Sequence, residues 1–161
     1  MIIARPGSAD YEAIDAVVAA AFGRRDEAEL VRSLRTSDSV LELIASDRGE
    51  AIGHVMYSRD WIETHGARHP AVQLAPLAVA PARQRSGIGG ALIAEGFAQL
   101  RALGETHVFV LGHGEYYPRF GFSGRAAAPF QSPWPRPSFM LARIAPGGPD
   151  NGQLVAPAAF L

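Results

Sequence analysis

The stretch Val72–Leu92, VQLAPLAVAPARQRSGIGGAL, contains the change of pattern that decides the fold. It begins as an apolar run typical of a strand, breaks at Pro81, and passes through Arg83 and Arg85 before it reaches the glycines of Gly87–Gly90. A helical pattern starts there. Glycines let a ligand approach the backbone closely, and the first N–H groups of a helix have no partner within the helix. The order strand, glycine-rich turn, helix therefore favours an anion site.

The residues around the glycines distinguish between the known kinds of phosphate-binding loop. A Walker-type loop requires a lysine, and this chain has none. A dinucleotide loop requires a third glycine, where this chain has Leu92. The pattern that remains, Gln84-x-x-Gly87-x-Gly89, resembles the Gln/Arg-x-x-Gly-x-Gly/Ala signature of the GNAT superfamily of acyl-CoA-dependent N-acetyltransferases. In that family the loop holds the pyrophosphate of coenzyme A. The motif alone leaves a plain glycine-rich turn as the alternative.

A second motif follows the long helix. The stretch Val108–Phe122, VFVLGHGEYYPRFGF, starts as an apolar strand and then spaces Tyr117-x-x-x-Gly121-Phe122. This spacing resembles the GNAT pattern downstream of the coenzyme loop. The whole run from Leu74 to Phe122 is similar to a bacterial branch of predicted N-acetyltransferases. The alternative is that Tyr116 and Tyr117 are only aromatic residues of the core.

The hydrophobic periodicity predicts one domain over residues 1–161, with the order βααβββαβαββ. This is an α/β fold of mixed α+β type, with a mixed central sheet and helices on both sides, as the GNAT resemblance also implies. Pro76 should interrupt pairing of the central strand, because proline has no N–H to donate. The expected strands are 1–5, 40–46, 51–62, 72–79, 106–111, 138–144 and 153–161, with a further start at 122–125; the helices are 10–22, 26–37, 87–103 and 116–120; the loops include 63–70 and the proline-rich 129–137.

Composition excludes several classes of protein. The 161 residues include no cysteine, which removes disulfides, thiolate metal sites and an acyl-cysteine intermediate. No stretch reads as a membrane span or a signal peptide, so we expect a cytoplasmic protein. Residues 1–70 hold 8 Arg and 12 Asp/Glu, a net charge of −4, whereas residues 71–161 hold 7 Arg and 4 Asp/Glu, a net charge of +3. No basic face with interleaved aromatics is present, so nucleic acid is not an expected partner.

The resemblance implies specific roles. Acetyl-CoA would be the co-substrate, and a backbone N–H near Leu77 would polarise its thioester. Ala78 and Val79 would pair with the pantetheine arm. Tyr117 matches the family tyrosine that protonates the departing thiolate, and Tyr116, counted among the coenzyme-binding residues, is its rival because a one-residue slip exchanges their faces. The pyrophosphate would be held by the N–H groups of Gln84, Arg85, Ser86, Gly87, Ile88, Gly89 and Gly90.

The general base stays open at this stage. The candidates by position are Glu63, His65, His69, Gln73, His113 and Glu115, and a chain of water molecules is the alternative. His65 and His69 have metal-pair spacing, but without an evident third ligand we expect no metal. The expected reaction is direct acetyl transfer to an amine by a monomer or homodimer. The alternatives are a non-catalytic acyl-CoA-binding or regulatory module, and transfer to oxygen or of a longer acyl group.

Overall fold

The structure is a computed structural model and describes residues 1–136 and 138–161. Eight strands of the described chain form one mixed sheet, with four α-helices and four short 3-10 turns around it. The strands are β1 (Ile2–Ala4), β2 (Ser39–Asp47), β3 (Glu50–Thr64), β4 (Ala67–Val79), β5 (His107–Leu111), β6 (Phe130–Gln131), β7 (Phe139–Arg143) and β8 (Gly152–Val155). The α-helices are α1 (Tyr11–Phe22), α2 (Asp26–Ser37), α3 (Ile88–Ala102) and α4 (Gly124–Ala127), and the 3-10 turns are η1 (Ser8–Asp10), η2 (Pro81–Arg83), η3 (Tyr117–Phe120) and η4 (Ala158–Phe160).

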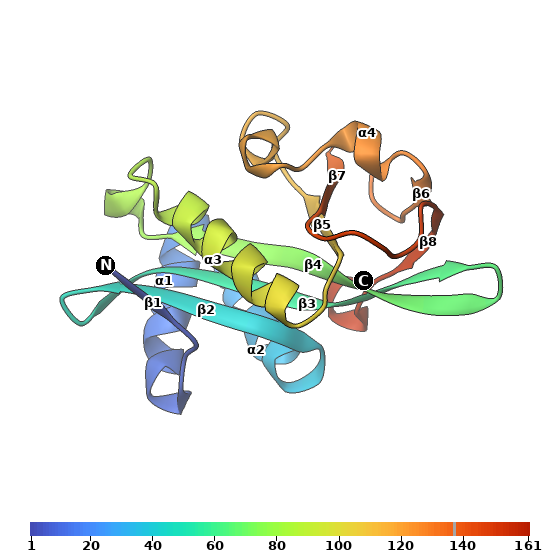
Figure 1. Ribbon diagram of the computed structural model, residues 1–161. Helices are drawn as coiled ribbons and strands as arrows, with labels where there is room; N and C mark the ends of the chain where they lie inside the picture. Colours follow the sequence, from blue (N-terminus) through green and yellow to red (C-terminus); the bar gives the residue numbers. More distant parts are fainter. Residues whose placement is uncertain (137) are drawn as a thin grey trace.

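The main strand order is β1-β2-β3-β4-β5-β7, and β8 joins the far end of β3 and pairs with β6. Along the main path only the β4–β5 pair is parallel. Helices α1 and α2 cover one face of the sheet and α3 covers the other (Figure 1). The predicted mixed α/β architecture is therefore confirmed. In the described part of the chain, no helix has the length and apolar character needed to cross a membrane.

The three long helices form where the apolar spacing predicted them. Each buries one stripe, because residues three and four apart share a helix face. The buried stripe is Ile14, Val17 and Val18 in α1, Ala28, Val31 and Leu34 in α2, and Ile88, Leu92, Ile93, Phe97 and Leu100 in α3. Helix α1 ends at Gly23, whose φ of 69° is the left-handed value that a helix C-cap needs.

Strand β4 has a bulge next to Pro76. Val55 of β3 pairs with Leu77, but Tyr57 pairs with Leu74, so β4 has one more residue than β3 in this interval. Pairing between β4 and β5 ends at Leu74. The predicted interruption at Pro76 is confirmed. The extra residue puts Leu74 and Leu77 on the α3 face of the sheet although they are three positions apart, and beyond Leu74 the β5-facing edge of β4 is unpaired among the described residues.

Four secondary-structure predictions need correction. Residues 63–70 are not a loop, because β3 and β4 meet in a two-residue turn in which His65 and Gly66 both have positive φ, as tight hairpins require. Ser123 does not start a strand but caps α4 by accepting a hydrogen bond from the Ala126 N–H. The last strand ends at Val155 and the chain closes in η4, and the proline-rich segment contains β6. Pro137 lies outside the described residues.

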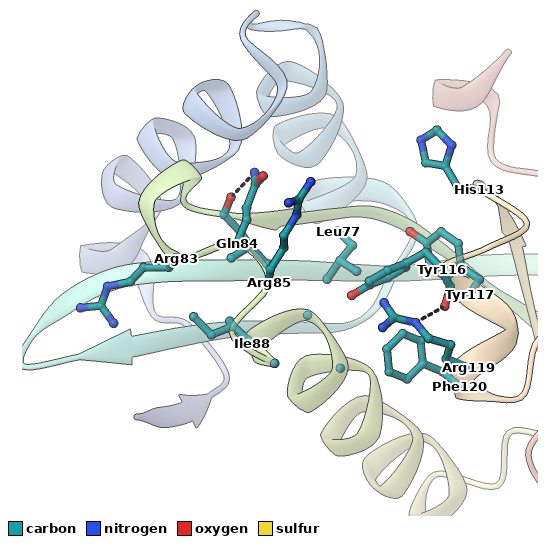
Figure 2. Close-up of a pocket in the computed structure, with 14 residues that line it drawn as sticks. Leu77, Arg83, Gln84, Arg85, Ile88, His113, Tyr116, Tyr117, Arg119 and Phe120 are labelled. Carbon is teal, nitrogen blue, oxygen red and sulfur yellow. Dashed lines mark hydrogen bonds between the residues drawn. The ribbon is translucent and has the colours of Figure 1, made fainter.

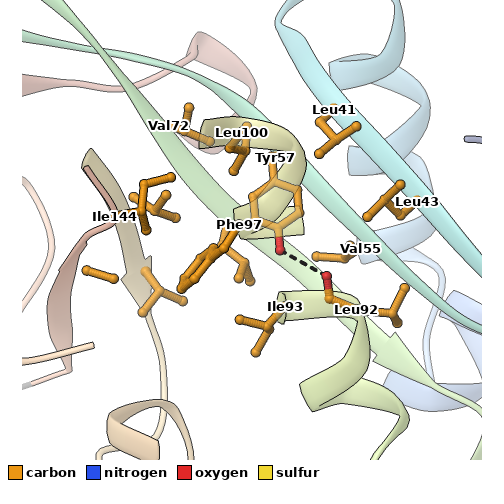
Figure 3. Packing of buried hydrophobic residues seen from close by; sticks show 14 of the residues in the cluster. Leu41, Leu43, Val55, Tyr57, Val72, Leu92, Ile93, Phe97, Leu100 and Ile144 are labelled. Atoms are coloured by element: carbon orange, nitrogen blue, oxygen red, sulfur yellow. Dashed lines mark hydrogen bonds between the residues drawn. The ribbon is translucent and has the colours of Figure 1, made fainter. Parts of the chain in front are cut away.

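Helix α3 lies close against the sheet at Gly96. Tyr57 is fully buried and its hydroxyl donates to the carbonyl of Leu92 at 3.3 Å (Figure 3). A Cβ at Gly96 would lie 2.1 Å from the Tyr57 hydroxyl and 2.4 Å from its Cζ. Only glycine lets the helix lie this close to the ring.

We therefore expect Gly96→Ala to lower the free energy of unfolding by about 1–3 kcal/mol, the usual cost of overpacking a core. Urea denaturation measures this directly. Gly7→Ala is the matched control, since a Cβ there meets nothing within 4 Å. Equal stability of the two variants would show that α3 does not lie against Tyr57 in this way.

Candidate active site

A cavity of about 860 Å³ lies where β4, the loop before α3 and the segment after β5 converge (Figure 2). Ten of the twelve residues to which the family resemblance assigned a coenzyme-binding or catalytic role line it. Arg83, His113, Arg119 and Phe120 complete the lining, which is otherwise Leu77, Val79, Gln84, Arg85, Gly87, Ile88, Gly89, Gly90, Tyr116 and Tyr117. Gly89, at the end of the first motif, and Tyr117, at the start of the second, are 28 positions apart in the chain, and the two motifs meet across this one cavity.

Ala78 and Ser86 are the two predicted residues whose side chains do not line the cavity. The bulge turns Ala78 toward α1, where it is buried with Ile44 and Met56. Ser86 is exposed and its hydroxyl donates to the Arg83 carbonyl within the loop. Any part that these two residues take in binding falls to their backbone groups.

The loop before α3 presents unpaired backbone donors. Arg85 and Gly87 both have left-handed φ values, 63° and 87°, and α3 begins at Ile88. The N–H of Ala91 is the first to close a helical bond, to the Gly87 carbonyl at 3.0 Å. No side chain of the described residues caps the first turn. The earlier N–H groups are therefore free to bind an anion.

The charge around this helix start is positive. Arg83, Arg85 and Arg119 line the cavity, and no carboxylate of the described chain does. Arg83 reaches away to Asp47 at 3.0 Å. Arg119 lies over the ring of Tyr116, 4.7 Å from its centroid. The Gln84 side chain donates to the Val79 carbonyl at 3.2 Å and ties the loop to the end of β4.

Tyr116 and Phe120 lie against the first turn of α3. A Cβ at Gly89 would lie 2.2 Å from the Tyr116 hydroxyl, and a Cβ at Gly90 would lie 2.8 Å from the Phe120 ring. The glycines therefore bring the aromatic wall close to the helix start. Partial burial raises the pKa of Tyr116.

Tyr117 has a different position. Its ring lies against Gly112, just beyond the end of β5, where a Cβ would be 2.2 Å from the ring. It also packs edge-on against Phe122. Burial raises the pKa of Tyr117 to about 12, so its phenol keeps its proton throughout the neutral range. The two tyrosines are perpendicular neighbours, 5.1 Å between ring centroids.

The comparisons with known proteins agree with this geometry. The family model of the acetyltransferase (GNAT) domain matches residues 3–124. A curated relative, the uncharacterized N-acetyltransferase YjhQ of Escherichia coli strain K12, is 41% identical over 132 residues, which cover 80% of this chain and 73% of that protein. The chain belongs to the GNAT family of acetyltransferases. The predicted enzyme class, an acyl-CoA-dependent N-acetyltransferase, is confirmed.

Two solved GNAT structures extend the likeness over the whole chain. A GNAT acetyltransferase from Brucella melitensis, in complex with acetyl-CoA, is 34% identical, with 99% of this chain and 97% of that chain covered and a TM-score of 0.82. The E. coli GNAT protein YhbS, in complex with CoA, is 30% identical, with 99% and 91% covered and a TM-score of 0.88. The predicted GNAT fold is confirmed.

The six candidate bases of this GNAT chain lie in three separate places. Glu63, His65 and His69 lie in the β3–β4 hairpin, roughly 30 Å along β4 from Leu77. Gln73 is buried on the sheet face opposite α3. His113 alone lines the main cavity, while Glu115 lines only a shallower hollow beside it.

The GNAT cavity also contains residues that sequence reasoning did not assign. Arg119 and Phe120 follow Tyr116 at spacings of three and four, which is the signal for one shared face of a helical turn. Among residues 1–136 and 138–161, no three His, Asp or Glu side chains are grouped as metal ligands.

Proposed function

We propose that this chain binds acetyl-CoA in the cavity between β4, α3 and η3 and transfers the acetyl group directly to an amine. The observation that carries the proposal is a convergence. A helix start without a carboxylate, an unpaired strand edge and a protonated tyrosine surround one space among the described residues.

The residues present fit coenzyme A. A pyrophosphate matches the unpaired N–H groups at the start of α3, the helix dipole and the nearby arginines. The absence of a Cβ at Gly89 and Gly90 lets Tyr116 and Phe120 lie against this helix start and form one wall of the cavity. The pantetheine arm carries amides, and the edge of β4 at Leu77–Val79 offers backbone groups to pair with them. A cavity of about 860 Å³ is in the range of cofactor sites.

Acetyl-CoA would supply the activated acetyl group as a thioester. We assign the N–H of Leu77 to the thioester carbonyl, where it would stabilise the charge that develops during attack. Tyr117 would donate its proton to the departing thiolate. Because the chain has no cysteine, an acyl-cysteine step is excluded, which favours direct transfer with both substrates bound together. The net charge of −4 on residues 1–70, which contain α1 and α2, favours a cationic acceptor.

The test is to mix the purified protein with acetyl-CoA and a panel of primary amines and to follow release of the free thiol. We expect release that depends on both the protein and an amine. Tight binding of acetyl-CoA by calorimetry without turnover over the panel would instead favour a non-catalytic module. Absence of binding would contradict the proposal as a whole.

A further inference from the structure

A strip of polar side chains crosses the sheet face opposite α3. Along β3, alternate residues point to one face, so Met56, Ser58, Asp60 and Ile62 share this side. Met56 belongs to the apolar cluster under α1 and α2, and Ile62 belongs to the cluster formed with β5, β7 and β8. Ser58 and Asp60 lie between the two clusters, and Gln73 of β4 pairs with Ser58.

These three side chains are buried without partners. Ser58 and Asp60 have no exposed area and Gln73 has 1%. Within the described residues, no hydrogen-bond partner is found for the Ser58 hydroxyl, either carboxylate oxygen of Asp60, or Oε1 of Gln73. Folded proteins rarely leave such groups unpaired, since each costs about 1–3 kcal/mol.

The other buried carboxylates of this chain make the contrast clear. Glu42 is held by Arg35 at 2.6 Å, and Glu105 is held by Arg59 at 2.7 Å. Arg59 is the chain neighbour of Asp60, yet it points to the opposite face and its guanidinium is occupied by Glu105. Burial raises the pKa of Asp60 well above its ordinary value and outweighs the positive charge of Arg59, which acts to lower it. Among the residues that the structure describes, Asp60 therefore has no cationic partner like those of Glu42 and Glu105.

The strip is closed by aromatic residues from two segments. Trp134 packs on the cluster that contains Ile62, and Phe160 of η4 packs on the cluster that contains Met56. Their rings meet edge-on with centroids 6.3 Å apart. These two rings therefore join the two clusters between which Asp60 lies.

The strip lies in line with the point where β4 and β5 stop pairing, which we call the fork of the sheet. Gln73 is four residues before Leu77, at the last pairs that β4 makes with β5. Val55 pairs with Leu77, and five residues further along β3 is Asp60, a distance of about 17 Å at the rise of a strand. An elongated molecule on this face could therefore have one end at the fork and the other at Asp60.

We propose that Ser58, Asp60 and Gln73 bind the remote end of the acceptor, and that the acceptor is a linear amine with a second cationic group roughly 10–17 Å from the amine that is acetylated. The proposal rests on the acetyl transfer proposed above. Asp60 is the counter-ion of the second ammonium group, and Ser58 and Gln73 accept hydrogen bonds from it. Asp60 is a positioning residue and takes no part in the chemical step.

The experiment uses α,ω-diamines from 1,3-diaminopropane to 1,12-diaminododecane, each with the monoamine of equal length. We expect kcat/KM to rise tenfold or more from the shortest diamine to the best longer one, and to exceed that of the matched monoamine, since a charged hydrogen bond is gained. Asp60→Asn should remove this gain through KM and leave acetyl-CoA affinity unchanged. Asp150→Asn, in an exposed pair with Arg143, is the control.

A second readout needs no turnover. Without acetyl-CoA, 1,8-diaminooctane should raise the Tm of the wild-type protein and not that of Asp60→Asn. Because the Asp60 pKa is raised on folding, its contribution to stability is present below its unfolded pKa and is lost as pH rises. Asp60→Asn should therefore unfold at a higher temperature than wild type at neutral pH and not at pH 3, which also shows that the variant folds.

The outcomes distinguish the two proposals. If Asp60→Asn leaves the turnover of both diamines and monoamines unchanged, the assignment of Asp60 is overturned. The proposed acetyl transfer then still stands. A Tm shift that depends on Asp60 without any acetyl transfer supports the amine site and overturns the proposed reaction. If the wild-type protein shows neither the kinetic gain nor the Tm shift, the amine site is overturned. The polar groups are then bound to water only.

Discussion

Tyr117→Phe should lower kcat by about ten- to a thousandfold, the usual range for lost general-acid help, with little change in acetyl-CoA affinity. The proton of Tyr117 matters only as the thiolate departs, so its loss acts on the transition state and not on the ground state. The raised pKa of about 12 keeps this proton in place at neutral pH. Steady-state kinetics with calorimetry of acetyl-CoA binding measure both quantities.

Tyr116→Phe is the matched control, because it removes the same atom from the neighbouring ring, which lies over Gly89. The effect of Tyr117→Phe should also shrink with a more acidic leaving thiol, which needs less protonation. Damage from Tyr116→Phe alone would exchange the roles of the two tyrosines. If both variants keep the wild-type kcat, the two tyrosines are packing residues of the core and neither is the general acid.

Gly89→Asp should weaken acetyl-CoA binding by about a hundred- to a thousandfold. Two unit charges about 4 Å apart repel by about 4 kcal/mol at the effective dielectric of a protein surface, and the new carboxylate would stand where the pyrophosphate is proposed to bind. An acidic residue in the first turn is favourable for the helix itself, so the fold should persist. Calorimetry gives the affinity and circular dichroism checks the fold.

Steric and electrostatic effects are separable at this glycine. A Cβ at Gly89 lies 2.2 Å from the Tyr116 hydroxyl, but the next atom of that ring is 3.5 Å away. Gly89→Ala should therefore fit well only together with Tyr116→Phe. We expect Gly89→Ala/Tyr116→Phe to bind acetyl-CoA and Gly89→Asp/Tyr116→Phe not to bind it. Equal affinity of these two double variants would remove the pyrophosphate from this helix start.

The parts of the site that were predictable from sequence are local. The glycines before α3 specify a turn and a helix start by themselves, and Tyr117-x-x-x-Gly121-Phe122 specifies a turn after a strand. Each motif needs only its own neighbours. Their convergence on one cavity followed from the family resemblance and is seen in the structure as the shared lining.

The parts that were not predictable depend on register between strands. The extra residue next to Pro76 reverses the faces of β4, so Ala78 points away from the cavity although its neighbours line it. Because β3 and β4 continue up to a tight turn at His65, both strands are longer than predicted. Three candidate bases therefore lie far from Leu77. Ser58 and Asp60 were not candidates at all, because alternation alone does not show which face of a strand meets which neighbour.

The central claim is that coenzyme A binds between α3 and the fork of β4 and β5. A crystal structure of the protein with CoA tests it most directly. We expect the pyrophosphate at the N–H groups of the first turn of α3, pantetheine against the edge of β4 at Leu77–Val79, and the sulfur within hydrogen-bond reach of the Tyr117 hydroxyl. CoA bound elsewhere, or bound here with its sulfur remote from Tyr117, would contradict the account.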